Sequence, residues 1–299
     1  MGSHILANPA FSDALVIGRS RPTYHSYFQT VSFEKNDEMA RILDNKDIVV
    51  HAAARAHVMN DTVKNPLDEY RRFNTLATLN LATQAAIAGV KRFIFVSSIK
   101  VLGEKTERGC SFKADDPFNP KDPYSVSKME AEIGLKLVGE AYGMEIVIIR
   151  PPLIYGAGVK GNFRSLIRLV KIGVPIPLAA IQNKRSLVSV NNLVDLIANC
   201  LSNENARNQT FLVSDDDDMS TPVLFAKLAE AGGYKSSVFS FPPGLLSYCF
   251  QIIGKSGIYD RLTNSMQVDI SHTKACLGWK PPLEVEEALR FCWPVDREI

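Results

Sequence analysis

Short apolar runs separated by amphipathic stretches are the feature that most constrains the fold of this chain. The runs rich in Val, Ile and Phe that have the length of buried strands are Ala14–Ile17, Asp47–His51, Phe93–Ser97 and Glu145–Arg150. Two stretches between them, Asp68–Ala88 and Ser125–Tyr142, repeat apolar residues at helical spacing. Gly89 and Gly143 follow these stretches, where glycine commonly ends a helix. Strands that alternate with helices predict an α/β fold with a parallel sheet.

The balance of charges excludes several kinds of partner. The 299 residues include 34 basic and 32 acidic side chains, interspersed along the chain, which leaves a formal net charge of +2. Such a chain has no broad field of one sign to collect nucleic acid or an anionic membrane. Hydrophobic residues make up 46% of the chain, which is enough for a large core. We therefore expect a globular protein with no nucleic-acid partner and no membrane partner.

The cysteines and the apolar stretches bear on compartment and metal binding. Five cysteines are scattered without a Cys-x-x-Cys spacing, which argues against a disulfide framework and a zinc site. We expect free thiols, no metal, and a cytoplasmic protein without a signal peptide. The most apolar long stretch, Phe241–Ile253, contains Pro242 and Pro243 and is too short to span a bilayer. It predicts a core helix of a small domain, and a helix lying on a membrane surface is the alternative.

A Tyr-x-x-x-Lys pattern at the start of a predicted helix indicates acid-base chemistry. Tyr124 and Lys128 are four residues apart and so share one face of a helix. A nearby ammonium favours phenolate and lowers a pKa that is ordinarily about 10, as a general base for alcohol oxidation requires. The spacing alone is weak evidence, because both residue types are common, and a surface pair is the alternative.

Two hydroxyl groups end the apolar run that starts at Phe93. In an open parallel sheet, ligands bind at the carboxyl ends of the strands, so Ser97 and Ser98 should face a ligand. We expect Ser98 to hydrogen-bond the reacting alcohol. A serine pair that caps a local turn is the alternative.

Further motifs are spread over essentially the whole chain. They are Val50-His51-Ala52-Ala53-Ala54, Asn74, Ser97-Ser98, Tyr124 with Lys128, Arg150-Pro151-Pro152, Tyr155-Gly156, Arg185-Ser186-Leu187-Val188 and Leu277-Gly278-Trp279-Lys280-Pro281. Together they resemble the extended short-chain dehydrogenases/reductases of the NAD-dependent epimerase/dehydratase family, and most closely the nucleotide-sugar enzymes similar to UDP-galactose 4-epimerase. The resemblance implies a Rossmann-type, doubly wound parallel sheet in residues 1–155. It implies a smaller α/β substrate-binding region in residues 156–299, with some segments returning to the first domain.

The resemblance also assigns roles to individual residues. It implies that Tyr124 is the catalytic base or acid, that Lys128 orients the nicotinamide ribose and that Ser98 binds the sugar hydroxyl. NAD or NADP is the implied cofactor and a UDP-sugar the implied substrate. The residues implied to lie along the cofactor are Gly2, Arg19, Ala52, Ala53, Ala54, Asn74, Ser97, Tyr124, Lys128 and Pro151. Those implied to hold the substrate are Ser98, Lys100, Asn162, Arg185 and Arg261. Arginine suits this role because its guanidinium can hydrogen-bond two phosphate oxygens at once. Asn74 and Arg261 could equally be surface residues.

The start of the chain departs from this family. Members open with a strand and a G-x-x-G-x-x-G loop that brings the pyrophosphate to a helix N-terminus, whereas here only Gly2 matches, as the last glycine. A cloning remnant is the alternative origin of Gly2-Ser3-His4. We expect roughly 10–15 more residues upstream in the natural gene, enough for a strand and a loop. The missing strand is central in the order 3-2-1-4-5-6, so its loss would leave two unpaired edges across a gap.

Two details bear on the cofactor and the sugar. Arg19 follows the strand Ala14–Ile17, at the place where an acidic residue would bind the adenosine 2′-hydroxyl. An arginine suits a 2′-phosphate, so NADP stands beside NAD. Leu102 stands where galactose epimerases have Tyr, which resembles the surface-polysaccharide branch of the family, including its 4-keto reductases.

Two activities fit the implied chemistry. An epimerase would oxidise the sugar 4-hydroxyl and return the hydride to the other face, whereas a 4-keto reductase would run only the reduction. A dehydratase is disfavoured, because Ile99 and Lys100 follow Ser98 and no acidic side chain stands there to expel water. A non-catalytic or cofactor-deficient nucleotide-binding protein of the same fold is the alternative. The resemblance further implies that the helices beginning near Asp68 and Ser125 could pair with their copies in a homodimer.

Overall fold

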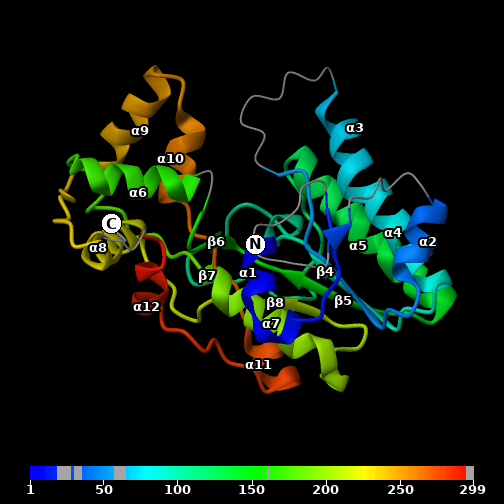
Figure 1. Cartoon of the computed structure of the whole chain (residues 1–299). Helices are drawn as coiled ribbons and strands as arrows, with labels where there is room; N and C mark the ends of the chain where they lie inside the picture. The colour runs from blue at the N-terminus through cyan, green and yellow to red at the C-terminus, as the bar shows by residue number, and fades with distance from the viewer. Residues whose placement is uncertain (19–27, 30–35, 57–64, 160–161, 294–299) are drawn as a thin grey trace.

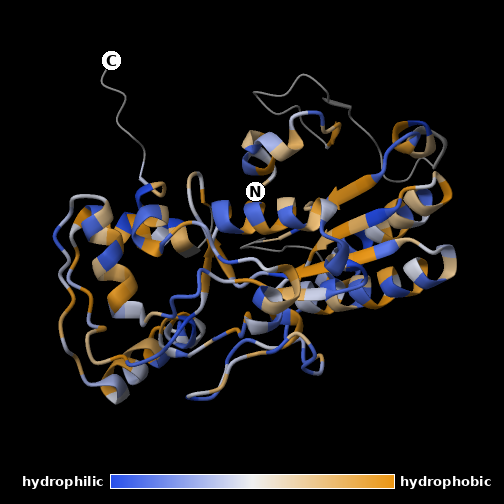
Figure 2. Cartoon of the chain, turned by 90° about the horizontal axis from the view of Figure 1, so that it is seen from below, coloured by the Kyte–Doolittle hydropathy of each residue, from blue (hydrophilic) through white to orange (hydrophobic). Residues whose placement is uncertain are grey.

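A four-stranded parallel sheet forms the centre of the first of the two parts of the molecule. The computed structural model describes residues 1–18, 28–29, 36–56, 65–159 and 162–293. The strands are, in spatial order, β3 (Ile48–His51), β4 (Arg92–Val96), β5 (Glu145–Arg150) and β8 (Thr210–Leu212). All of their pairings are parallel, with Val50 opposite Ile94 and Ile94 opposite Val147. These hydrophobic strands lie between helices whose faces differ in hydropathy, which confirms the predicted α/β class (Figure 2).

A second, separate pair of strands lies beside this sheet. It consists of β1 (Val16–Ile17) and β2 (Phe28–Gln29), which are also parallel. Within the described residues no strand joins the pair to β3. The split falls where the order 3-2-1-4-5-6 predicted a missing central strand. The short helix α1 (Gly2–Ala7) precedes β1, and its Ile5 belongs to the same buried cluster as Ile94.

The helix α5 (Pro123–Tyr142) carries strong local signals at both ends. At its start, the Asp122 carboxylate accepts a hydrogen bond from the Ser125 amide at 2.7 Å, and the Ser125 hydroxyl accepts one from the Asp122 amide at 3.1 Å. This reciprocal capping fixes where the helix begins. At its end, Gly143 adopts the left-handed conformation with φ of 70°, which favours glycine. The predicted helix and its stop are confirmed.

The predicted helix Asp68–Ala88 is present but contains a wider turn. It is built from α3 (Pro66–Tyr70), a π-helical segment (Arg71–Leu76) and α4 (Ala77–Ile87). With α2 (Asn36–Leu43) and α5 it covers one face of the main sheet, where a buried cluster forms around Phe93 and Phe95 (Figure 1). A π-helical turn inserts one extra residue and is frequent at functional sites.

The chain after residue 156 contributes to both parts of the molecule. It supplies the edge strand β8 to the main sheet, and the helices α7 (Val190–Ser202) and α11 (Ser271–Leu277) pack against the other face of that sheet. The second part has its own buried cluster, to which Tyr155, Phe163 and Leu228 belong (Figure 1). Its elements are β6 (Leu153–Tyr155), β7 (Leu187–Ser189), α6 (Asn162–Ile172), α8 (Thr221–Ala231), α9 (Pro243–Ile252), α10 (Ser256–Thr263) and α12 (Val285–Arg290).

The stretch Phe241–Ile253 does not form the predicted core helix. It contains α9, in which Leu246 is the one buried residue. The prediction was wrong because α9 packs on the rest of the second part along a narrow side, through Leu246 and the partly buried Phe250. Among the described residues no helix combines the length and apolar composition needed to cross a bilayer. The same residues contain no group of three His, Cys, Asp or Glu placed to hold a metal.

Candidate active site

Tyr124 and Ser98 meet at the carboxyl end of β4. Tyr124 lies in the first turn of α5, where the capping by Asp122 fixes the direction of the helix. Ser98 follows β4, and its hydroxyl accepts a hydrogen bond from the Lys100 amide at 3.3 Å, which caps a short turn. The Ser98 hydroxyl also lies close enough to the Tyr124 phenol to lower the pKa of the phenol. The structure therefore brings together the serine and the tyrosine that the sequence singled out.

The Tyr124 phenol is a weaker acid than that of an ordinary tyrosine. Burial raises the pKa of Tyr124 to about 12, and the charge of Asp122 adds to the shift, while the neighbouring Ser98 hydroxyl opposes it. The ring of Tyr70 packs edge-on against it, with 6.1 Å between ring centroids. The phenol is thus protonated at neutral pH. This differs from the expectation that a nearby ammonium would favour phenolate.

The ammonium of Lys128 points away from the phenol. Its Nζ donates a hydrogen bond to the Val96 carbonyl at 2.8 Å and lies 4.1 Å from the centroid of the Phe95 ring. The side chain is 1% exposed, and this burial lowers the pKa of Lys128 to about 7, while the charge of Glu132 acts in the opposite direction. The shared helix face places Tyr124 and Lys128 near each other, as predicted. The long lysine side chain nevertheless extends to β4, so the expected contact between the two groups is absent.

A buried histidine lies beside this lysine, and the sequence analysis assigned it no role. His51 ends β3, and its ring stacks on Phe95 with 5.9 Å between centroids. Its Nε2 is 3.0 Å from the Thr78 hydroxyl. Burial, and to a smaller extent the charge of Lys128, lowers the pKa of His51 to about 3. The imidazole is therefore neutral near pH 7 and adds no second positive charge next to Lys128.

Asn74 connects the segment after β3 to α5. Its Oδ1 accepts a hydrogen bond from the Arg55 amide at 2.8 Å, and its Nδ2 donates to the Arg55 carbonyl at 3.1 Å. The same Nδ2 donates to the Ser127 hydroxyl at 3.1 Å. Asn74 is 1% exposed, so the alternative of a surface residue is excluded. The π-helical turn directs this side chain inward, which helical spacing alone does not reveal.

Several features at the carboxyl ends of the strands fit a dinucleotide. Ala53 and Ala54 follow β3 and are exposed, and Ala52 is half-buried, so small side chains leave room there. The buried Ser97 hydroxyl has no hydrogen-bond partner among the described residues. A bound ligand that offers such a partner would remove the cost of this unsatisfied group. The cofactor roles of Ala52–Ala54, Ser97 and the buried Pro151 remain predictions that this geometry supports.

Two other residues implied at the cofactor are less informative. Gly2 is exposed in the first turn of α1, where an added Cβ would meet no atom within 4 Å. Arg19 lies outside the described residues. The structure therefore gives no contact that favours NADP over NAD.

Lys100 links the segments that carry Ser98 and Tyr124 instead of standing free for substrate. Its Nζ lies 2.5 Å from a carboxylate oxygen of Asp122 and 3.0 Å from one of Glu104. Asp122 uses its other oxygen to cap α5. A continuous chain of contacts thus runs from Ser98 through Lys100 and Asp122 to the turn that carries Tyr124. We call this the Lys100–Asp122 link.

The residues implied to hold the nucleotide are only partly brought together. Arg185 precedes β7, and its Nη1 donates to the Arg261 carbonyl at 2.5 Å and the Asn264 carbonyl at 3.3 Å. Burial lowers the pKa of Arg185. The Arg261 guanidinium is exposed and donates to the Gly257 carbonyl of its own helix at 2.8 Å. Asn162 begins α6, but its side chain is not among those described.

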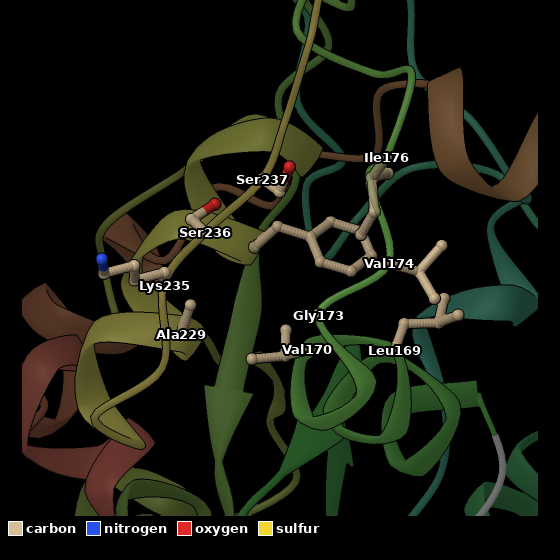
Figure 3. A pocket seen from close by; sticks show the side chains of 10 residues that line it. Leu169, Val170, Gly173, Val174, Ile176, Ala229, Lys235, Ser236 and Ser237 are labelled. Atoms are coloured by element: carbon tan, nitrogen blue, oxygen red, sulfur yellow. The ribbon is translucent and has the colours of Figure 1, made fainter.

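A hollow in the second part is separate from these residues (Figure 3). It is lined by side chains of α6 and α8 and by residues 235–237. Its lining is largely apolar, and Val170 and Ile176 are among its side chains. Since Tyr124 and its neighbours do not contribute to it, the hollow is not the candidate acid-base site.

Residues 1–214 match the model of the NAD dependent epimerase/dehydratase family. The chain belongs to this family. The match spans both the strand end with Ser98 and the helix start with Tyr124. The dependence on a nicotinamide dinucleotide is part of the family's definition, and the unsatisfied Ser97 hydroxyl agrees with it.

Several proteins that resemble this chain are nucleotide-sugar or glycolipid 4-epimerases by name. The chain is 53% identical over 249 residues to a UDP-glucose 4-epimerase of Vibrio cholerae, which covers 83% of this chain and 76% of that protein. It is 30% identical over 199 residues to the N-acetyl-alpha-D-glucosaminyl-diphospho-ditrans,octacis-undecaprenol 4-epimerase of Escherichia coli O157:H7, covering 64% and 58% of the two chains. The crystal structure of UDP-glucose 4-epimerase with UDP-glucose from Thermotoga maritima is 21% identical. It superposes with a TM-score of 0.76 over 97% of this chain and 93% of that one, which shows the same Rossmann-type fold.

Proposed function

We propose that this protein is a UDP-hexose 4-epimerase that uses NAD or NADP. The observation that carries the proposal is that Ser98 and Tyr124 lie together at the carboxyl end of β4. The two residues occur in a chain that is 53% identical to a UDP-glucose 4-epimerase. That similarity favours epimerisation over the 4-keto reduction that Leu102 suggested.

In the proposed reaction Tyr124 exchanges a proton with the sugar 4-hydroxyl. Ser98, whose hydroxyl lies next to the phenol, hydrogen-bonds the same sugar hydroxyl and positions it for this proton exchange. The bound dinucleotide supplies a hydride acceptor in the oxidation and a hydride donor in the reduction. Oxidation removes the hydroxyl proton and the hydrogen on C4 and leaves a 4-keto sugar. Reduction of its opposite face, with a proton returned by Tyr124, inverts C4.

Lys128 provides the positive charge that this reaction requires. A phenol with a pKa of about 12 holds its proton too firmly to act as a base near neutral pH. Lys128 lies four residues later on the same face of α5, and its pKa of about 7 allows it to become charged when a ligand offers new hydrogen-bond acceptors. We infer that its ammonium leaves the Val96 carbonyl and turns toward the ribose and the phenol when the site fills.

The second part of the molecule holds the nucleotide in this proposal. Arg185 is the residue we assign to the pyrophosphate, because it is anchored on the end of α10 by its contacts with the Arg261 and Asn264 carbonyls. All five cysteines have free thiols, which fits a reducing compartment, and we place the reaction in the cytoplasm.

We also propose a homodimer through the surface of α4 and α5. These helices pack side by side. Leu76, the residue directly before α4, is 63% exposed, and Ile133 and Leu137 on α5 are 44 and 61% exposed. Exposed apolar side chains on adjacent helices are typical of a surface that another helix pair covers. Light scattering of the purified protein tests this, and a monomer at all concentrations would contradict it.

The direct test of the proposed activity uses UDP-glucose without added reductant. The protein is incubated with UDP-glucose and a catalytic amount of NAD, and the nucleotide sugars are separated by chromatography. Conversion to UDP-galactose without net consumption of the dinucleotide is the expected result. A strict need for stoichiometric NAD(P)H with a 4-keto substrate would identify a reductase instead. Binding of UDP-glucose without any turnover under both conditions would support the non-catalytic alternative.

The Lys100–Asp122 link predicts opposite changes in the pH dependence of turnover. In Lys100→Met, the Asp122 carboxylate loses its partner, so the pKa of the phenol rises and the acid limb of the kcat profile moves up by roughly half a pH unit or more. In Asp122→Asn the limb moves down, because asparagine still caps α5 but carries no charge. The double variant should lie near the wild type. If both single variants move the limb in the same direction, the link does not act through charge.

A further inference from the structure

One end of the second part exposes an unusual amount of apolar surface. Figure 1 shows α6, α9 and α10 together on the side of the molecule away from α4 and α5. We call residues 163–176 and 234–263, which contain these helices, the outer lobe. Of the nineteen large apolar side chains that the described residues expose, ten are in the outer lobe. They are Leu169, Ile172, Val174, Tyr234, Phe239, Leu245, Tyr248, Ile252, Ile253 and Ile258.

The helix α9 turns its apolar face outward. Leu245, Tyr248 and Ile252 follow the spacing i, i+3, i+7 and therefore share one face of the helix. They are 50, 59 and 68% exposed, and Ile253 directly after the helix is 59% exposed. Single exposed apolar residues need no explanation, but a continuous stripe of this kind marks an interaction surface.

The charges of the outer lobe identify the kind of partner. The lobe contains six basic side chains and one acidic side chain, Asp260, although the net charge of the whole chain is only +2. The rest of the chain is therefore net negative. The basic residues are Arg164, Arg168, Lys171, Lys235, Lys255 and Arg261, and all of them are exposed. A partner of this surface must combine an apolar interior with negative charge at its boundary.

We propose that the outer lobe binds the surface of an anionic phospholipid bilayer, with α9 lying in the headgroup region. A helix that buries Leu and Ile among the acyl chains and is flanked by cations has the composition of an interfacial anchor. Tyr248 suits the boundary between the acyl chains and the hydrated headgroups, because a tyrosine has an apolar ring and a polar hydroxyl. Lysine side chains can bury their stems while their ammonium groups meet lipid phosphates.

The same charges argue against a second copy of this chain as the occupant. In a two-fold symmetric interface the same patch faces itself, so the six basic side chains of one copy would meet those of the other. Such like-charge contact is strongly unfavourable in an interface. The proposed homodimer surface on α4 and α5 is on the other side of the molecule and is unaffected.

Flotation of the full-length protein with lipid vesicles tests the proposal. Vesicles of phosphatidylcholine alone are compared with vesicles that also contain phosphatidylglycerol, at low and at high salt. We expect roughly tenfold or greater enrichment on the anionic vesicles at low salt, and its loss at high salt. The triple variant Leu245→Ser/Tyr248→Ser/Ile252→Ser should reduce the enrichment by at least roughly tenfold. The charge variant Lys235→Glu/Lys255→Glu should do the same.

The matched control replaces exposed apolar residues that lie outside both the outer lobe and the proposed dimer surface. Val223→Ser/Phe291→Ser changes side chains that are 43 and 45% exposed, on α8 and directly after α12, and should leave flotation unchanged. All variants should melt at the wild-type temperature and convert UDP-glucose at the wild-type rate, because none of these residues lies near Tyr124. The proposal is overturned if anionic vesicles do not enrich the protein or if the triple variant still floats. It is also overturned if light scattering shows that the triple variant dissociates a dimer, which would make a second copy the occupant.

Discussion

Tyr124→Phe is expected to lower kcat by about 10²- to 10⁴-fold and to leave the affinity for UDP-glucose unchanged. The variant keeps the ring and its edge-on contact with Tyr70, and it removes only the hydroxyl that lies next to Ser98. The proton of the sugar 4-hydroxyl then has no acceptor in the site. Turnover is measured by the chromatographic assay and affinity by titration calorimetry.

The neighbouring tyrosine supplies the matched control for this prediction. Tyr70→Phe also removes a phenol hydroxyl beside the site, on a ring 6.1 Å from that of Tyr124. It should retain kcat within about threefold, since its hydroxyl contacts no reacting atom in the proposed reaction. Equal losses in the two variants would show that the site depends on packing in this region and not on the chemistry of one phenol.

Glu132→Gln is expected to destabilise the folded protein by about 3–5 kcal/mol, the largest loss that we predict for a single substitution. Glu132 and Arg150 form a bidentate ion pair whose side chains are 0 and 3% exposed, with Arg150 Nη2 to Glu132 Oε2 at 2.7 Å. The guanidinium also donates to the Ala114 carbonyl at 2.9 Å and packs over the ring of Phe118. Loss of the carboxylate charge leaves a buried cation without its counter-charge. Unfolding in urea, followed by circular dichroism, measures the change.

A partly exposed ion pair that also involves α5 provides the control for this experiment. Glu130 pairs with Arg71, and their side chains are 27 and 43% exposed. Glu130→Gln should therefore cost little, because solvent screens such a pair. The double variant Glu132→Leu/Arg150→Met should recover most of the stability, since both charges leave the interior together. A larger loss for Glu130→Gln than for Glu132→Gln would contradict the assignment of the buried pair.

Much of the first part could be predicted from the sequence because its signals are local. The strands β3, β4 and β5 were predicted to within one or two residues at each end, since continuous apolar runs are bounded there by Gly89 and Gly143. The strands β6, β7 and β8 have three residues each and were not predicted. A run so short has no period to recognise, and its pairing depends on segments far away in the sequence.

The sequence predicted which residues form the candidate site more reliably than how their side chains are arranged. Ser98 and Tyr124 are together because both follow from where a strand ends and a helix begins. The direction of the Lys128 side chain depends instead on the Val96 carbonyl and the Phe95 ring of β4, which its ammonium contacts. The outward face of α9 was missed for a similar reason, since a pattern of apolar residues does not state which neighbours cover them.

Because of the buried Lys128, the number of protons that the protein binds near neutral pH changes when it unfolds and when it binds a ligand. The pKa of Lys128 is about 7 in the folded chain against its usual 10.5. Between these values the unfolded chain binds more protons, so stability increases as the pH rises from about 7 toward 10.5. A cofactor whose ribose hydroxyls approach Nζ would raise this pKa again, and the protein would take a proton from the buffer as it binds. The heat of binding at pH 7 should then change with the ionisation enthalpy of the buffer, which calorimetry in phosphate and in Tris would reveal.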